Sequence, residues 1–237
     1  TRLIFGETVA NPRTEVLDIP KVAEIAHEQH IPLIVDSTTT TPYLIRPFDL
    51  GADIVIHSAT KFLSGHGTVM AGLVVDGGTF DWESSDKFPQ MTEKYAGFHN
   101  LSFVEEFGPA AYIARVRNEA ARDFGACLAP NSSFLVLNGM ETLSVRMDKH
   151  ISNTKKVVDY LKNHEVVEWV SHPDLEDHPN HELAKTLLPK GSTAVFSFGI
   201  KGGREVGQIF IDRLDLFSNL ANIGDSKSLV IHPASTT

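Results

Sequence analysis

Short apolar runs alternate with stretches of helical periodicity in the first third of the chain. A helix is predicted to begin at Asp18, which can cap it, and Val22, Ile25 and Ala26 then recur at helical spacing. Buried strands are predicted at Leu33–Val35, Asp53–His57 and Leu73–Val75. Strands that alternate with helices predict an α/β protein with a mostly parallel sheet and flanking helices.

The pattern is less regular in the middle of the chain. Residues 79–101 are predicted to form an extended loop, and a helix over 102–124 either begins after Gly108 or is kinked at Pro109. Apolar residues from Val136 to Leu161 follow spacings of mostly three, four and seven, which predicts one long helix over about 133–163.

A smaller α/β unit is predicted after that helix, with strands at Val166–Val170 and Ala194–Ile200. We therefore expect three parts: a large domain over 1–130, a linking helix over 131–163 and an incomplete small domain over 164–237. The chain begins at Thr1 rather than at a Met and ends abruptly at Ser235-Thr236-Thr237. We expect it to be part of a longer protein whose N- and C-terminal parts are missing.

Composition narrows the function classes. The 237 residues are 42% apolar and 22% charged, which is typical of globular proteins, and no run approaches the about 18 apolar residues of a membrane helix. The net charge of −9 argues against nucleic-acid and anionic-membrane partners. The single cysteine, Cys127, is expected in the core, and it excludes an intrachain disulfide, which fits the reducing cytoplasm.

The residues from Asp53 to Gly67 carry the clearest chemistry. A buried strand leads into Ser58, Thr60 and Lys61 and then a glycine-containing loop, and Asp36 ends the neighbouring strand at the same edge. Pyridoxal 5′-phosphate needs such a set: an amine for its aldehyde, a carboxylate for its ring nitrogen and hydroxyls for its phosphate. A carboxylate about 4 Å from the protonated nitrogen contributes about 4 kcal/mol at an effective dielectric of about 20.

Asp53–Gly67 resembles the signature of the pyridoxal-phosphate enzymes of cysteine and methionine metabolism, the transsulfuration family, and satisfies each of its fifteen positions. Glu7–Pro12 resembles the family motif whose Asn, here Asn11, lies over the cofactor ring. Ser228–Ser235 resembles the substrate-side segment, where Ser228 would lie near the substrate carboxylate.

The resemblance implies the type I fold of pyridoxal-phosphate-dependent transferases. Lys61 would then carry the cofactor, Asp36 would pair with the pyridinium, and Ser58 and Thr60 would bind the phosphate. It also implies that a ring-stacking Tyr, a Gly-Met pair at the phosphate, and a Tyr and an Arg from a neighbouring subunit precede Thr1. The Arg for the substrate carboxylate would follow the last residue.

Three segments favour γ-replacement of O-acetyl-L-homoserine by sulfide, which gives L-homocysteine and acetate. Lys227 stands where family members that handle cystathionine usually carry Glu, and Asn138 stands where many lyases have Arg. The loop Tyr95–Asn100 resembles an insertion of the members that use sulfide. The alternatives are γ-elimination, replacement by cysteine, or an inactive truncated homologue. The signature around Lys61 disfavours an aminotransferase.

The expected partners are small-molecule substrates and further copies of the chain, as a homodimer or homotetramer, because family sites borrow residues across a subunit interface. No metal site is expected. His27 and His30, and the histidines within His172–His181, are interpreted as solvated surface residues because no cysteine or carboxylate completes a ligand set. His66 is interpreted as a packing histidine.

Overall fold

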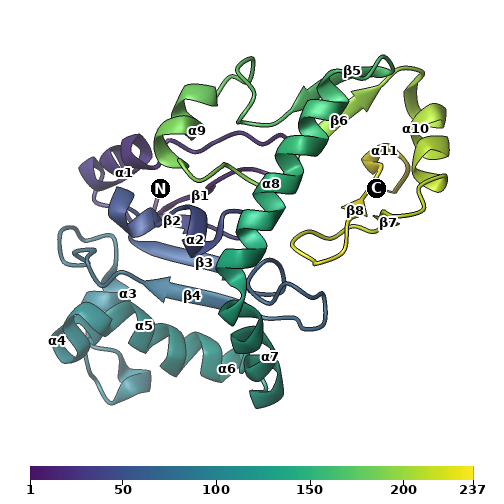
Figure 1. Cartoon of the computed structure of the whole chain (residues 1–237). Helices are drawn as coiled ribbons and strands as arrows, with labels where there is room; N and C mark the ends of the chain where they lie inside the picture. Colours follow the sequence, from purple (N-terminus) through teal and green to yellow (C-terminus); the bar gives the residue numbers. More distant parts are fainter. Residues whose placement is uncertain (237) are drawn as a thin grey trace.

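A four-stranded sheet lies at the centre of the first half of the chain in the computed structural model, which describes residues 1–236 (Figure 1). Its order along the sheet is β1 (Ile4–Glu7), β2 (Leu33–Asp36), β3 (Ile54–Ser58) and β4 (Gly72–Asp76). The first three strands are parallel and β4 is antiparallel to β3, which confirms the mostly parallel sheet. Glu7 is paired with Asp36, so the carboxyl ends of β1 and β2 meet at one edge.

Helix α1 (Ile19–Glu28) covers the sheet and begins as predicted. The Asp18 carboxylate accepts a hydrogen bond of 3.2 Å from the Lys21 N–H, and Pro20 occupies the first turn. Ile19, Ala23 and Ala26 are buried. The capping pattern therefore fixed the start of this helix. Its buried face differs from the predicted Val22, Ile25 and Ala26, because Ile25 is exposed and Ala23 is buried instead.

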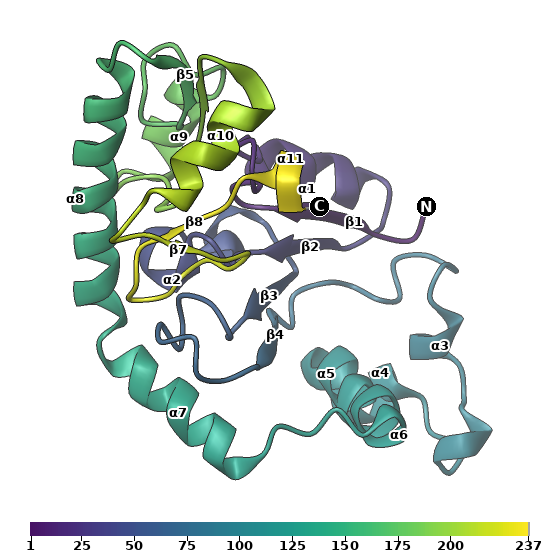
Figure 2. The ribbon, with the colours of Figure 1, turned by 90° about the vertical axis from the view of Figure 1, so that its right-hand side faces the viewer.

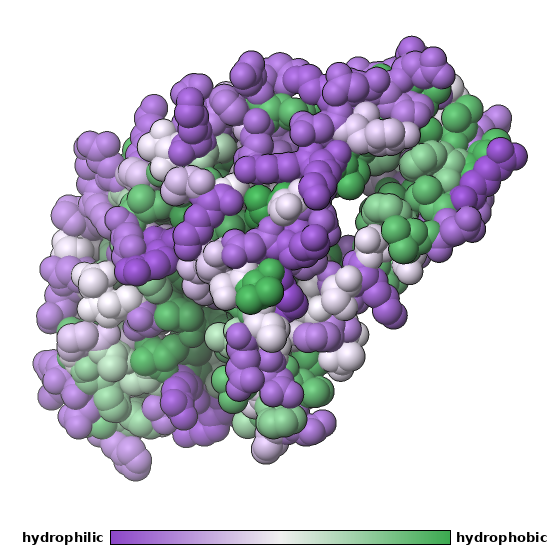
Figure 3. Space-filling view, viewed as in Figure 1, coloured by the Kyte–Doolittle hydropathy of each residue, from purple (hydrophilic) through white to green (hydrophobic). Residues whose placement is uncertain are grey.

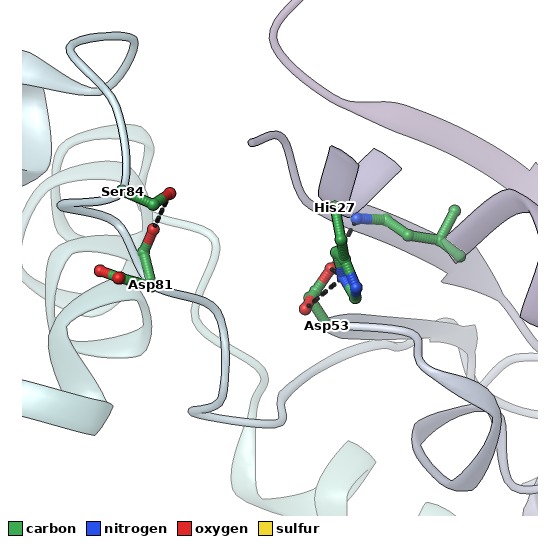
Figure 4. A network of polar contacts seen from close by, with 5 residues as sticks. His27, Asp53, Asp81 and Ser84 are labelled. Carbon is green, nitrogen blue, oxygen red and sulfur yellow. Dashed lines mark hydrogen bonds and ion pairs between the residues drawn. The ribbon is translucent and has the colours of Figure 1, made fainter. Parts of the chain in front are cut away.

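Asp53, the first residue of the signature, holds α1 against the sheet (Figure 4). Its buried carboxylate accepts a hydrogen bond of 2.7 Å from the Leu33 N–H and lies 2.9 Å from His27 Nε2. One side chain thus joins β2, the start of β3 and the last turn of α1. His27 lies at the surface as predicted, with its side chain 44% exposed, and its Nε2 also takes part in this structural contact.

The segment after β4 is irregular, as predicted, but holds short helical turns. Helix α3 (Pro89–Thr92) and the turn η2 (Ala96–Phe98) lie in this segment, whereas α2 (Thr41–Leu44) and η1 (Pro47–Leu50) lie between β2 and β3. The predicted helix over 102–124 is a chain of short pieces: α4 (Phe103–Phe107), η3 (Gly108–Ala110), α5 (Ala111–Arg115), the π-helical η4 (Val116–Ala121) and α6 (Arg122–Phe124). Gly108, at a positive φ of 51°, ends α4, and Pro109 follows in η3.

Cys127 is exposed, and its predicted place in the core is wrong. It lies in the connection between α6 and α7, where Ala126 and Ala129 are exposed as well. Apolar neighbours in sequence do not make a core unless a helix or strand turns them toward one face.

The predicted single helix over 133–163 is two helices, α7 (Pro130–Glu141) and α8 (Leu143–Lys162), which meet at an angle (Figure 2). Thr142 separates them with φ −104° and ψ 8°. Its hydroxyl donates to the Gly139 carbonyl at 3.3 Å, and Arg146 donates to the same carbonyl at 2.6 Å. This carbonyl is thus engaged by side chains at the break, which hydrophobic spacing alone does not reveal.

The last third contains two small sheets and three helices within the described residues. β5 (Val167–Ser171) pairs antiparallel with β6 (Ser197–Ile200), which confirms both predicted strands, and β7 (Ser218–Asn219) pairs parallel with β8 (Leu229–Val230). The helices are α9 (His181–Leu187), α10 (Gly203–Asp212) and α11 (Pro233–Thr236). Across residues 1–236, no helix combines the length and the apolar character needed to cross a membrane.

His172 is buried, contrary to the predicted surface position. Its Nε2 lies 3.1 Å from the Thr193 carbonyl, and burial lowers the pKa of its imidazole. It follows directly after β5, where the chain turns inward against a loop 21 residues downstream. Sequence spacing within the loop could not show this distant contact.

Candidate active site

Lys61 lies on the turn that follows β3. Its N–H donates to the Ser58 carbonyl at 3.1 Å, and its own carbonyl accepts from the Gly65 N–H at 2.8 Å. The side-chain amine, Nζ, donates to Asn222 Oδ1. The turn therefore directs the amine away from β3 and toward the segment that contains Asn222.

A cavity of about 130 Å³ opens where β1, β2 and β3 end. It is lined by Glu7, Asn11, Asp36, Thr38, Thr39, Ser58 and Ile223. Three predicted site residues, Asp36, Ser58 and Asn11, thus meet in one place. Lys61 is not part of the lining, but its partner Asn222 is the chain neighbour of Ile223, so the amine lies beside the cavity.

Hydrogen bonds orient the cavity wall. Asp36 Oδ1 accepts from the Thr38 N–H at 2.8 Å, and Thr38 Oγ1 accepts from the Ser58 N–H at 2.8 Å. Asn11 is tied to the other wall, because its N–H donates to Glu7 Oε2 at 3.3 Å. Within residues 1–236 the Ser58 hydroxyl has no hydrogen-bond partner, so it can donate to a ligand.

Buried hydroxyl groups behind the cavity lining support this wall. Thr40 Oγ1 lies 2.8 Å from Thr8 Oγ1 and 2.9 Å from Ser37 Oγ, which joins the ends of β1 and β2. His57 Nδ1 lies 3.1 Å from the Ser37 carbonyl, and burial lowers the pKa of His57, which keeps its ring neutral. These paired polar groups make the floor rigid, because breaking any of them leaves a buried group unsatisfied.

Thr60 is held by the backbone opposite it. Its hydroxyl accepts from the Ala71 N–H at 2.9 Å and donates to the Ala71 carbonyl at 3.2 Å. The hydroxyl proton is therefore engaged inside the chain, whereas that of Ser58 is available. In this arrangement Thr60 fixes the backbone at the start of the turn that carries Lys61.

The segment 222–227 packs directly on the Lys61 turn. A Cβ on Gly224, which has a φ of +74°, would overlap the Phe62 N–H, and the Ser226 N–H donates to the Gly65 carbonyl at 2.9 Å. Buried Asp225 accepts from the Lys227 N–H at 3.0 Å and so shapes this segment.

Ser228, the predicted substrate contact, is not brought to the cavity. It is exposed, and its carbonyl accepts from the Ser218 N–H at 3.0 Å at the edge of β8. Asn222 is the polar residue of this region that reaches Lys61. Sequence reasoning missed Asn222 because several polar residues follow one another there and nothing local distinguishes the one that meets the lysine.

The cavity matches the needs of pyridoxal phosphate. Asp36 and Glu7 stand side by side at its wall, and within residues 1–236 neither forms an ion pair with a cationic side chain. Two unneutralised carboxylates favour a cationic partner such as a protonated ring nitrogen. The available Ser58 hydroxyl can donate a hydrogen bond to a phosphate, and the adjacent Lys61 amine can react with an aldehyde. No group of three or more metal-ligating side chains occurs among the described residues.

A lysine beside an acidic, hydroxyl-lined cavity at the carboxyl ends of parallel strands defines the class of α/β proteins that bind pyridoxal phosphate. The family described as "Cys/Met metabolism PLP-dependent enzyme" matches residues 1–237, and the chain belongs to this family of enzymes. The resemblance found in Asp53–Gly67 is thereby confirmed over the whole sequence.

Curated relatives match the whole chain. It is 48% identical to a sulfhydrylase of Gibberella moniliformis, 46% identical to the homocysteine synthase of Schizosaccharomyces pombe and 45% identical to the O-acetyl-L-homoserine sulfhydrylase of Leptospira meyeri. These alignments cover 100% of the chain and 55–56% of each relative. The chain thus spans about half the length of the relatives it matches.

Solved structures share the fold. A putative O-acetylhomoserine (thiol)-lyase of Campylobacter jejuni, which contains a pyridoxyl-lysine phosphate, superposes with a TM-score of 0.96 at 37% identity over 100% of this chain and 56% of its own. A cystathionine γ-lyase of Lactobacillus plantarum with bound L-serine gives 0.78 at 31% identity over 100% of this chain and 53% of its own. The type I fold expected from the resemblance is therefore confirmed.

Proposed function

We propose that this chain holds the cofactor lysine of an enzyme that performs γ-replacement on O-acetyl-L-homoserine, with sulfide as the acceptor and L-homocysteine and acetate as products. The observation that carries the proposal is the meeting of Lys61 with Asn222 beside the cavity of Asp36 and Ser58. The relatives named for sulfhydrylase and homocysteine synthase activity support the reaction.

Each cavity residue has a distinct proposed task. Asp36, oriented by the Thr38 N–H, would hold the positive charge at the cofactor's ring nitrogen. The Ser58 hydroxyl would donate to the phosphate, Asn11 would contact the ring from the β1 side, and Thr60 would reach the phosphate only if its bonds to Ala71 open. Pyridoxal phosphate supplies an electron sink for charge that develops at the substrate α carbon.

Lys61 Nζ would first bind the cofactor and then, once displaced by the substrate amine, move protons at the substrate α and β carbons. When no cofactor is bound, the amine donates to Asn222 Oδ1. Ser228 would act on substrate only if the segment 222–228 changed its position, because the residue now lies outside the cavity.

Two measurements test this function. Borohydride reduction of the protein loaded with pyridoxal phosphate, followed by peptide mapping, should mark Lys61, and a label on another lysine overturns the site. Product analysis of the complete protein with O-acetyl-L-homoserine and sulfide should give homocysteine. Oxo-acid and ammonia would instead indicate γ-elimination, the chemistry of the more distant lyase neighbour, and absence of turnover with bound cofactor would indicate an inactive homologue.

We also propose that the enzyme is a homodimer or homotetramer in the cytoplasm. Apolar side chains remain exposed on α7, where Phe134 and Leu137 are 59% and 62% accessible, and hydrophobic residues also gather over α10 (Figure 3). Such patches are typical of surfaces that become covered in an assembly. Sedimentation of the complete protein tests the oligomer, an active monomer being the contrary result, and cell fractionation tests the location.

A further inference from the structure

The junction of α7 and α8 packs backbone to backbone on the turn that carries Lys61. A Cβ added to Gly139 would overlap the carbonyl oxygen of Ser64, so no side chain fits between the helix and the turn. The contact joins residues far apart in sequence, and it comes from the side of the turn formed by residues 62–65.

The Arg146 guanidinium fills the remainder of this contact. Nη1 donates to the Phe62 carbonyl at 2.7 Å, and Nη2 donates to the Leu63 carbonyl at 3.2 Å and to the Gly139 carbonyl at 2.6 Å. Nε donates to Thr142 Oγ1 at 3.2 Å. Within residues 1–236 no carboxylate pairs with this cation, so its charge is directed entirely at oxygen dipoles of the turn and of the helix junction.

A second residue of α8 supports the same turn. His150 lies one helical turn after Arg146, and its ring meets the buried Phe62 ring edge to face at 5.5 Å. Phe62 directly follows Lys61, so its carbonyl is held by Arg146 and its side chain by His150. Burial lowers the pKa of both Arg146 and His150, and the nearby Arg146 charge lowers that of His150 further, so the imidazole stays neutral.

We propose that Arg146 is a positioning residue for the reaction: it fixes the carbonyls of Phe62 and Leu63, the two residues after Lys61, and thereby keeps the lysine amine at Asn222 and the cavity. The proposal rests on the function proposed above. A guanidinium suits the task because its planar fork reaches several carbonyls at once, whereas a lysine ammonium is a single compact donor. Ordinary packing between a helix and a loop predicts only a change in stability.

The test compares Arg146→Lys and Arg146→Met with a matched control, Arg46→Met, which removes an exposed arginine that pairs with Asp49. Hydrogen exchange of peptides that cover residues 61–65 is measured without cofactor. Pyridoxal phosphate titration, the rate at which borohydride traps the cofactor on Lys61, and the pH dependence of its visible absorbance are measured on the same proteins.

We expect faster exchange at 61–65 in both Arg146 variants and trapping on Lys61 slowed by about tenfold, roughly the loss of one hydrogen bond to a charged group. The pH profile of the absorbance should shift, and the control should match the wild type. Folded Arg146 variants with wild-type trapping and an unchanged pH profile overturn the proposal. If Arg146→Met does not fold, Arg146→Lys and Thr142→Val provide the same comparison. If the wild type never loads cofactor on Lys61, the proposed function fails, whereas the exchange data still decide whether Arg146 fixes the turn.

Discussion

Replacing Asp36 by Asn isolates the charge of the cavity wall. The amide keeps the shape of the side chain, and its oxygen can still accept the 2.8 Å hydrogen bond from the Thr38 N–H. What disappears is the negative charge that we propose faces the cofactor's ring nitrogen. Since Glu7 also lines the cavity, the variant retains one carboxylate nearby but not at the end of β2.

The expected magnitude follows from Coulomb's law. Unit charges about 4 Å apart contribute about 4 kcal/mol at an effective dielectric of about 20, which corresponds to about three pKa units at the nitrogen. Asp36 is only half-buried, so water screens part of this energy. We therefore expect kcat/KM to fall by between about tenfold and a thousandfold.

The assay measures kcat/KM of the complete protein with O-acetyl-L-homoserine and sulfide, with cofactor content and urea unfolding recorded for each variant. Asp49→Asn is the control, because Asp49 pairs with Arg46 at the surface, and it should leave all three quantities unchanged. Near-normal turnover of a folded, cofactor-loaded Asp36→Asn protein refutes the assigned charge interaction.

Three further outcomes are expected. Asp53→Asn should lower the free energy of unfolding by about 1–3 kcal/mol, because the buried carboxylate accepts a hydrogen bond from the Leu33 N–H and lies against His27. Urea titration measures this free energy, and a change no larger than that of a surface variant contradicts the prediction. Burial lowers the pKa of His57 and His172, so the unfolded state binds more protons at acidic pH and the free energy of unfolding should fall below about pH 6.5; a Tm that is constant between about pH 7.5 and 5.5 contradicts this. Sulfide should be preferred over cysteine, and Lys227→Glu should alter that preference by no more than about twofold because Lys227 is exposed and screened, which a competition assay measures.

The local sequence pattern was sufficient to predict the parts of the molecule whose contacts are between residues close in sequence. The cap at Asp18, the buried strands β2 and β3 and the turn with Lys61 each depend on residues close in sequence, and the parallel arrangement then brings Asp36 and Ser58 to one cavity. The Asp53–Gly67 signature added the cofactor and the family.

The features that the sequence did not show depend on contacts between distant segments. The α7–α8 break follows from the packing of Gly139 on Ser64 and from the bonds of Arg146, none of which leaves a mark in hydrophobic spacing. The same holds for buried His172 and for the choice of Asn222 over Ser228 at the lysine. Periodicity describes which face of an element is buried, but not which neighbour it will meet.

The contact between Lys61 and Asn222 also sets an order of events during synthesis. The two residues are 161 positions apart, so this is among the longest loops that folding has to close. At a translation rate of about 5–20 residues per second, the lysine turn leaves the ribosome about 8 to 32 seconds before its partner. The sheet and its turn can form in that interval from nearer contacts, while the amine stays open to solvent. We therefore expect the nascent chain to acquire a stable cofactor only after the segment around Asn222 has been made.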